Sequence, residues 1–77
     1  MDVENERPLD LLNASKGKRV MVELKNRTSF VGKLRAFDIH INTVLDEAEE
    51  LENGETKRKI GKLFLRGDAI ILISPAE

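Results

Sequence analysis

The sequence contains no cysteine, and His40 is the single histidine among its 77 residues. Disulfide bonds and cysteine-ligated zinc are therefore excluded as sources of stability. One histidine without cysteine also argues against a structural metal site, and we expect no cofactor. A chain of this length forms one small domain with a marginal core, so oligomerisation is the natural source of further burial.

Long hydrophobic runs are missing as well. No apolar stretch approaches the ~20 residues that a membrane-spanning helix needs. The segment 1–6 is acidic and lacks the apolar core of a secretory signal, so we expect a disordered tail on a cytoplasmic protein. A charged fraction of 35% beside a hydrophobic fraction of 40% is typical of a globular chain and not of a disordered one.

The sequence also lacks any recognisable catalytic constellation. His40 has no cysteine partner, and no serine stands in a motif with an acid and a base. We therefore expect a binding protein with no small-molecule substrate, and not an enzyme. The tripeptide Arg66-Gly67-Asp68 also serves in cell adhesion, but three residues are too few to carry that meaning here.

Charge is unevenly distributed along the chain, although the net charge is only −1. The segment 16–35 holds seven basic residues against Glu23, whereas the segment 46–55 holds six acidic residues and no basic one. This segregation can produce one basic face and one acidic face, and ordinary solvated surface is equally compatible with it. The net charge by itself argues against indiscriminate nucleic-acid binding.

The hydrophobic pattern predicts one short helix and then five strands. The helix is expected at 7–15, with Pro8 in its first turn and Gly17 just beyond its end. After Gly17 the pattern alternates, which predicts strands at 20–24, 30–36, 39–48, 57–65 and 69–74. One helix followed by five short antiparallel strands predicts a mostly β fold, a strongly bent five-stranded barrel of SH3-like or OB-like size.

Glycines and turn residues indicate where this barrel bends. Gly32 and Gly61 lie inside predicted strands and indicate bends or bulges there. The pair Asn53-Gly54 is a strong hairpin signal. A helix over 45–51 is the competing interpretation, because glutamate and alanine favour helices, but a hairpin connects the flanking strands better.

The last two predicted strands are apolar on both faces. Their apolar residues are Leu63, Phe64, Leu65, Ile70, Ile71, Leu72 and Ile73. Such strands need cover on both sides, and an open apolar edge invites uncontrolled pairing. Pairing with a neighbouring copy solves both problems, and a head-to-tail contact closes into a ring. A monomer whose helix covers one face is the alternative.

Two segments together resemble the Sm and Sm-like family, most closely its archaeal ring-forming members. The first is Phe-Asp-Ile-His-Ile-Asn-Thr-Val-Leu at 37–45, which together with the preceding strands from Val20 resembles the first Sm motif, over about 19–48. The second, at 60–75, contains the hydrophobic-Arg-Gly-Asp-hydrophobic core of the second Sm motif, which spans about 58–75.

The resemblance covers 7–75, which would then be one Sm domain. Departures are mild: Ile41 stands where the family often has methionine, and Ala69 where it often has asparagine. The bacterial Hfq-type branch fits less well, because Arg66-Gly67-Asp68 replaces its basic second-motif signature.

The resemblance implies a homo-oligomeric ring, with seven subunits or alternatively six, that binds uridine-rich single-stranded RNA as a scaffold or chaperone. It implies a base pocket at the inner rim, lined by His40, Asn42, Arg66, Gly67 and Asp68. His40 and Arg66 would stack on the base, a contact worth ~1–3 kcal/mol for aromatic platforms. Asn42 would read the uracil edge, oriented by Asp68, and an extended chain would place it on one face with His40.

Two other functions remain open from the sequence. The first is a protein-interaction ring whose RNA binding is incidental, and RNA affinity would separate it from the RNA-binding ring. The second is an SH3-like monomeric barrel inside a larger complex. The mass of the free protein would separate that barrel from either ring.

Overall fold

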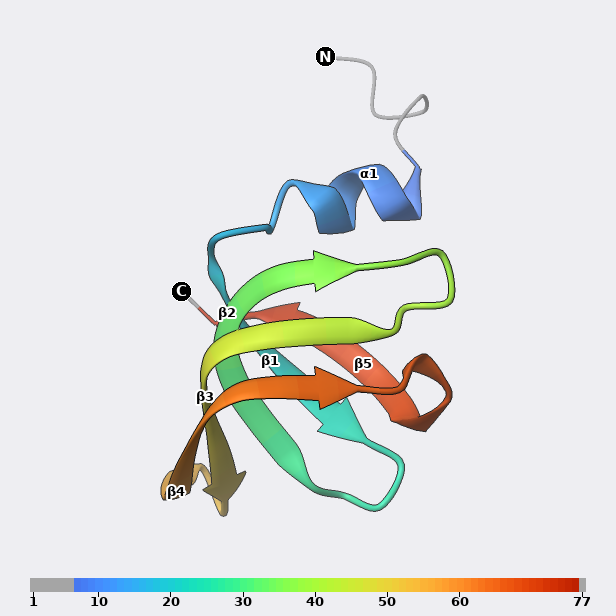
Figure 1. Cartoon of the computed structure of the whole chain (residues 1–77). Helices are drawn as coiled ribbons and strands as arrows, with labels where there is room; N and C mark the ends of the chain where they lie inside the picture. The colour runs from blue at the N-terminus through green and yellow to red at the C-terminus, as the bar shows by residue number, and fades with distance from the viewer. Residues whose placement is uncertain (1–6, 77) are drawn as a thin grey trace.

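The computed structural model describes residues 7–76 as one helix followed by a five-stranded antiparallel sheet (Figure 1). The elements are α1 (Pro8–Asn13), β1 (Arg19–Leu24), β2 (Ser29–Phe37), β3 (Thr43–Glu52), β4 (Glu55–Leu65), the 3₁₀ helix η2 (Gly67–Ala69) and β5 (Ile70–Pro75). The strand order is β4-β3-β2-β1-β5, so β4 and β5 form the two edges. The predicted mostly β fold is confirmed. The predicted acidic tail at 1–6 lies outside the described residues.

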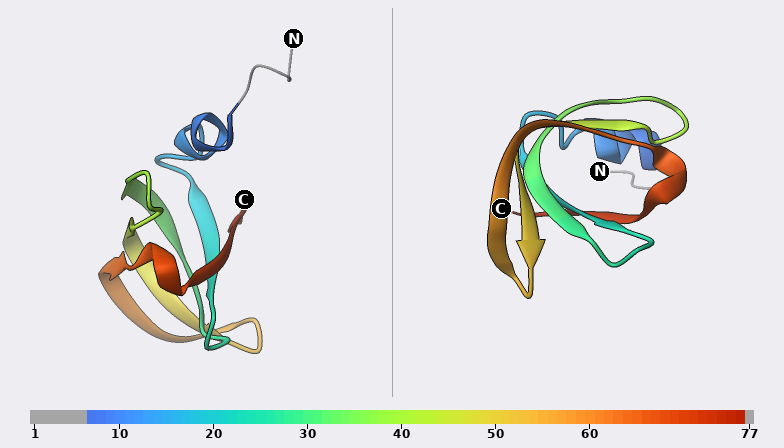
Figure 2. Two further views of the ribbon diagram at one scale, coloured as in Figure 1. Left: turned by 90° about the vertical axis from the view of Figure 1, so that its right-hand side faces the viewer. Right: turned by 60° about the horizontal axis from the view of Figure 1, so that its bottom comes forward.

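Bends allow the long strands β2, β3 and β4 to curve around the core (Figure 2). Gly32 is buried at a register shift between β2 and β3, where a Cβ would lie 2.9 Å from the carbonyl oxygen of Asp46. Gly61 faces Ala48 at a second shift and adopts a φ of +90°, which glycine tolerates best. Both predicted bends are confirmed, the first by close backbone approach and the second by a left-handed backbone.

The core is made of aliphatic residues from the sheet and one phenylalanine. Its buried members are Val20, Val22, Phe30, Leu34, Leu45, Ala48 and Leu65. Full burial of one such large side chain contributes ~1.5–3 kcal/mol. Helix α1 adds Leu12 to this core and lies at the end of the sheet opposite the β1–β2 and β3–β4 turns (Figure 1). No helix within residues 7–76 is long and apolar enough to cross a bilayer.

The third strand differs from the prediction at both ends. It begins at Thr43 and not at Ile39, because the preceding residues form a turn in which the N–H of Ile41 donates to the carbonyl of Asp38 at 3.0 Å. It continues to Glu52 because its acidic half pairs with both β2 and β4. The helix considered for 45–51 does not form, and the hairpin turn at 53–54 is confirmed, with φ of +55° and +82°.

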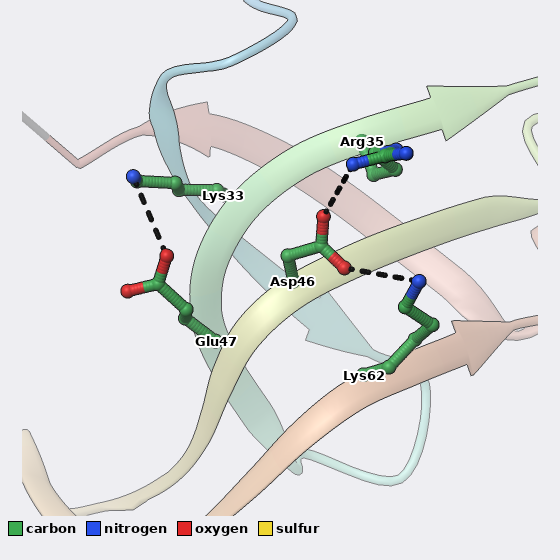
Figure 3. A network of polar contacts seen from close by, with 5 residues as sticks. All are labelled: Lys33, Arg35, Asp46, Glu47 and Lys62. Carbon is green, nitrogen blue, oxygen red and sulfur yellow. Dashed lines mark hydrogen bonds and ion pairs between the residues drawn. The ribbon is translucent and has the colours of Figure 1, made fainter.

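Charges that are segregated in the sequence are mixed in space. The carboxylate of Asp46 lies 3.3 Å from a guanidinium nitrogen of Arg35 on β2 and 3.6 Å from the ammonium of Lys62 on β4 (Figure 3). Glu47 lies 3.4 Å from Lys33 in the same way. Antiparallel pairing therefore sets the acidic strand between basic ones, and separate basic and acidic faces do not form here.

The predicted interface residues divide into core members and exposed members. Leu65 is only 9% exposed and belongs to the core, and three more residues pack partly against it: Leu63, Ile70 and Ile73. The exposed members are Phe64 at 73%, Ile71 at 55% and Leu72 at 39%. Among the strand pairs of the described chain, β4 and β5 are not partners, so each edge strand keeps one open side.

Replacing Gly32 by alanine should destabilise the protein by about 1–3 kcal/mol, the usual cost of overpacking. The added Cβ would meet two backbone atoms, the carbonyl oxygen of Asp46 at 2.9 Å and the Cα of Ala48 at 3.0 Å. Denaturant unfolding measures the loss. The control is Gly54→Asn, whose side chain meets open space and tolerates a positive φ, at a cost of about 1 kcal/mol or less. Equal losses in the two variants would contradict this account of the bend.

Candidate functional site

Two loops meet at one side of the sheet, the β2–β3 loop at 38–42 and the β4–β5 turn at 66–69 (Figure 1). The backbone N–H of Gly67 donates to the side-chain Oδ1 of Asn42 at 2.8 Å. A Cβ built on Gly67 would overlap the carbonyl oxygen of His40. Glycine is therefore required at this position by close backbone approach, and the two loops are joined through it.

Asp38 organises the first of these loops. Its Oδ1 accepts hydrogen bonds from the backbone N–H groups of His40 at 2.8 Å and Asn42 at 3.1 Å. Its Oδ2 accepts from the side-chain Nδ2 of Asn42 at 3.0 Å. The hydrogen bond from the Asn42 side chain is the main cause that holds the pKa of Asp38 below its ordinary value of 3.8, and the two backbone N–H groups lower it further. Desolvation acts in the opposite direction.

The amide of Asn42 is fixed in one orientation by these contacts. Its oxygen faces the N–H of Gly67 and its nitrogen faces the carboxylate of Asp38. A flipped amide would set donor against donor and acceptor against acceptor. One N–H and one oxygen lone pair remain for a ligand, because an amide carries two donors and two acceptor sites. The site thus presents a donor beside an acceptor, which suits the Watson–Crick edge of uracil.

The prediction that Asp68 orients this amide is wrong. Asp68 instead accepts a hydrogen bond from Nη2 of Arg66 at 3.1 Å, and both side chains are largely exposed. The orienting carboxylate is Asp38, four residues before Asn42. A signal for it exists in the sequence, since an aspartate that begins a turn commonly accepts from backbone N–H groups just after it.

Three of the five predicted site residues meet at Gly67 in the structure, and the other two pair with each other. His40, Asn42 and Gly67 meet directly, whereas Arg66 and Asp68 pair with each other. The expected extended arrangement of His40 and Asn42 is wrong, because the residue between them, Ile41, adopts a φ of +64°. The loop is a turn, and its imidazole is exposed.

A hollow of about 470 Å³ lies beside the joined loops. Its lining includes the polar residues Asn42 and Arg66 and the apolar residues Phe37, Val44 and Phe64. Since Phe64 lies on the edge strand β4, the hollow runs from the polar site to an open edge of the sheet. Within residues 7–76 no group of three or more histidine, cysteine or carboxylate side chains is placed to hold a metal ion.

Comparison with known protein families gives a match over residues 10–75 to the LSM domain. A curated snRNP Sm-like protein of Methanococcoides burtonii is 51% identical over 69 residues, covering 90% of this chain and 96% of that protein. A curated snRNP Sm-like protein of Archaeoglobus fulgidus is 50% identical over 70 residues, covering 91% of each chain.

Solved structures give the same match. The Pyrococcus abyssi Sm protein in complex with a uridine heptamer superimposes with a TM-score of 0.87 at 45% identity, covering 92% of this chain and all of that one. A heptameric archaeal Sm protein superimposes with a TM-score of 0.81 at 39% identity, covering 87% of this chain and 97% of that one.

Lowering the pH should release the Asn42 amide only below the ordinary carboxyl pKa of 3.8. Because the folded-state pKa of Asp38 is depressed, its stabilising effect is present above 3.8 and is lost as the pH falls through the lower folded value. NMR should show the side-chain amide of Asn42 and the backbone N–H of His40 shifting together in that range. Asp38→Asn should remove this transition, and a midpoint at or above 3.8 would contradict the assignment.

Proposed function

Because this chain belongs to the Sm-like (LSM) family, we propose that it assembles into a ring that binds uridine-rich single-stranded RNA at its inner rim. The observation that carries the proposal is the Asn42 amide, fixed between Asp38 and Gly67 with one donor and one acceptor free. A uridine heptamer bound to the similar Pyrococcus abyssi protein and the heptameric state of another relative support uridine as ligand and seven as ring size.

The proposed role is that of a scaffold or chaperone in RNA processing or turnover, by binding and without a reaction. The proposed setting is the cytoplasm, because single-stranded RNA is an intracellular ligand. The ring would consist of identical copies, with a hexamer as the alternative to a heptamer.

In the proposed complex, the free N–H of Asn42 donates to O4 of uracil and its oxygen accepts from N3–H. Cytosine offers the reverse pattern, a donor at C4 and an acceptor at N3, so an amide that cannot flip favours uracil. His40 and Arg66 stack on the faces of the base. Arg66 can leave Asp68 at little cost, since exposed ion pairs such as this one are worth about 0–1 kcal/mol.

The proposed ring joins the open side of β4 in one protomer to the open side of β5 in the next. This contact is head-to-tail, so it closes into a ring when the rotation permits. It would cover Phe64, Ile71 and Leu72, which the isolated protomer exposes. A ring also multiplies a modest affinity, because one RNA strand that occupies one pocket reaches the next pocket intramolecularly.

Base selectivity should depend on Asn42 and Asp38, and affinity without selectivity on His40. Asn42→Ala should weaken oligo(U) binding. It should also lower the ratio of oligo(U) to oligo(C) affinity about tenfold per site, because it removes hydrogen bonding with a net contribution of ~1–1.5 kcal/mol. Asp38→Ala should lower that ratio more than it lowers total affinity, because the amide can then flip. His40→Ala should weaken both RNAs in proportion. Titrations of the unmodified protein and the three variants with each RNA, at one fixed salt concentration, measure these affinities.

The matched control for Asp38→Ala is Asp68→Ala, which removes a carboxylate that does not contact the amide. It should leave the ratio of oligo(U) to oligo(C) affinity close to that of the unmodified protein. If Asn42→Ala keeps the ratio, or if Asp68→Ala lowers it as much as Asp38→Ala does, the assignment of base recognition is wrong. All variants must first be shown to form the same assembly.

Phe64→Asp and Ile71→Asp should each prevent ring assembly while leaving a folded protomer, because both side chains are exposed in the single chain. An unpaired charge buried in the joint would cost several kcal/mol. Light scattering gives the mass, with circular dichroism to confirm folding. Leu11→Asp on α1 is the control, since Leu11 at 54% is as exposed as Ile71 at 55%. An unmodified protein that remains monomeric at micromolar concentration would contradict the ring. Leu65→Asp is unsuitable, because Leu65 lies in the core.

A further inference from the structure

The first part of β4 is an open sheet edge that carries many charges. Strand β4 runs from Glu55 to Leu65 at one edge of the sheet, and its residues 55–59 are all exposed. We call residues 55–59 the hairpin edge, because they lie on the β3–β4 hairpin at the end of the molecule away from α1 (Figure 1). The hairpin edge pairs with β3 on its inner side only, so alternate N–H and C=O groups on its outer side have no partner within the described sheet.

The proposed ring leaves the hairpin edge uncovered. Strand β4 has 11 residues, whereas β5, which pairs with it across the proposed joint, has only six. The exposed Phe64 and the half-buried apolar residues Ile60 and Leu63 lie in the later part of β4, which suits an apolar joint. Pairing of six residues backwards from Leu65 reaches Ile60, so the hairpin edge stays open in the assembled ring.

Charge alternates from strand to strand on this side of the sheet. The acidic strand β3 lies between the cations of β2 and those of β4, as the contacts of Asp46 illustrate (Figure 3). The hairpin continues this pattern, since Glu50 lies 2.7 Å from Arg58 and Glu52 lies 3.8 Å from Lys57. Cations of β4 thus have carboxylates on one side and an empty strand position on the other. An acidic strand in that position would continue the alternation.

Three consecutive cations, Lys57, Arg58 and Lys59, occupy the hairpin edge. In the described part of the chain Lys59 forms no ion pair. The side chains of Lys57 and Glu52 are 54% and 62% exposed, and such exposed pairs contribute little stability. Arg58 contacts Glu50 and still exposes 70% of its side chain. A carboxylate from outside can therefore approach each of the three cations without breaking a strong contact.

A second copy of the same edge is excluded as the partner. Antiparallel pairing of two hairpin edges about their cations would set Arg58 opposite Arg58 and Lys57 opposite Lys59, and like charges directly opposite each other are destabilising. Lys57 is also skipped in the pairing with β3, and the register shift there distorts the edge. Charges and bulges of this kind keep identical edges apart. Toward an acidic strand the same cations become attractive.

The hairpin edge suits a polypeptide better than a nucleic acid. The hairpin segment 49–59 holds four carboxylates against three cations, which disfavours a chain of phosphates. An open edge also presents C=O groups beside its N–H groups. Phosphates can only accept hydrogen bonds, whereas an extended polypeptide both donates and accepts along its whole length and so satisfies both kinds of group.

We propose that the hairpin edge binds an extended, acidic segment of another protein, which adds to the sheet as a further strand beside β4. Main-chain hydrogen bonds supply affinity, and carboxylates opposite the three cations supply selectivity. The extent of the free edge rests on the proposed ring, in which every protomer repeats the site. Figure 1 shows the hairpin apart from the two loops of the base site, so RNA and the acidic segment can be held at once.

The probe is a fluorescently labelled peptide of about seven residues in which valine and glutamate alternate, and anisotropy measures its binding. The unmodified protein should bind it, and a peptide with lysine in place of glutamate should not bind. Lys57→Gln with Lys59→Gln should weaken binding roughly 2- to 30-fold, because two opposite-charge pairs are lost. The control, Lys16→Gln with Lys33→Gln, removes the same charge elsewhere and should bind as the unmodified protein does. It is matched in kind, since Lys33 pairs with Glu47 in an exposed ion pair.

Strand addition is separated from simple charge attraction by two isomeric peptides. One carries N-methyl groups on its valines and the other on its glutamates. Because alternate N–H groups of a strand face its neighbour, one of the two peptides should lose binding and the other should keep it. In the unmodified protein the bound acidic peptide should slow hydrogen exchange of backbone N–H groups within 55–59. Circular dichroism confirms that all variants are folded.

Four outcomes overturn the proposal: no saturable binding of the acidic peptide below about 1 mM, equal losses in the two double variants, equal binding of the two N-methylated peptides, or no exchange protection within 55–59. Oligo(C) that displaces the peptide and depends on Lys57 and Lys59 would assign the edge to nucleic acid and overturn it as well. The proposed ring fails separately, if light scattering shows a monomer. Protection by the peptide would then extend into 60–65, whereas in the ring it should stop at 59.

Discussion

The hydrogen bond from the N–H of Gly67 to the side chain of Asn42 joins the two loops on which the site depends. It links positions 25 residues apart in the sequence, and it forms only because Gly67 lets the carbonyl of His40 approach closely. Asp38 holds the other end of the same amide. The proposed base recognition thus rests on an amide that is held on both sides, by the carboxylate of Asp38 and by the backbone N–H of Gly67.

The strands and their bends could be predicted because local chemistry decides them. The glycines at 32 and 61 and the turn at 53–54 lie where the structure bends. The start of the third strand could not be predicted in this way, because Ile39 continues the apolar alternation. The turn begun by Asp38 overrides that pattern and leaves Ile39 75% exposed. Likewise, cross-strand pairing overrides the helix propensity of the acidic segment 45–51.

The resemblance predicts His40, Asn42 and Gly67, which the structure brings together, but it predicts neither Asp38 nor the hydrogen bonds of the site. Asp38 lies four residues before Asn42, and Asp68 directly follows Gly67. From the sequence, either carboxylate could hold the amide of Asn42. The choice depends on which way its oxygen points, and this is set by Gly67 from a distant segment. The interface residues show the same limit. Leu65 and Phe64 are adjacent and equally apolar, and only the path of β4 decides that the first is buried and the second exposed.

An acidic chain can bind RNA because charge acts locally. At physiological salt, charges further apart than about 8 Å are largely screened, so Arg66 at the proposed base site acts on its own surroundings more than the net charge of −1 does. The exposed pair of Arg66 with Asp68 leaves this guanidinium available, since such pairs contribute little stability. The proposed ring repeats the site in every protomer, and a strand that occupies one pocket reaches the next one intramolecularly. The modest affinity of a single exposed pocket is multiplied in this way, without any need for a positive net charge.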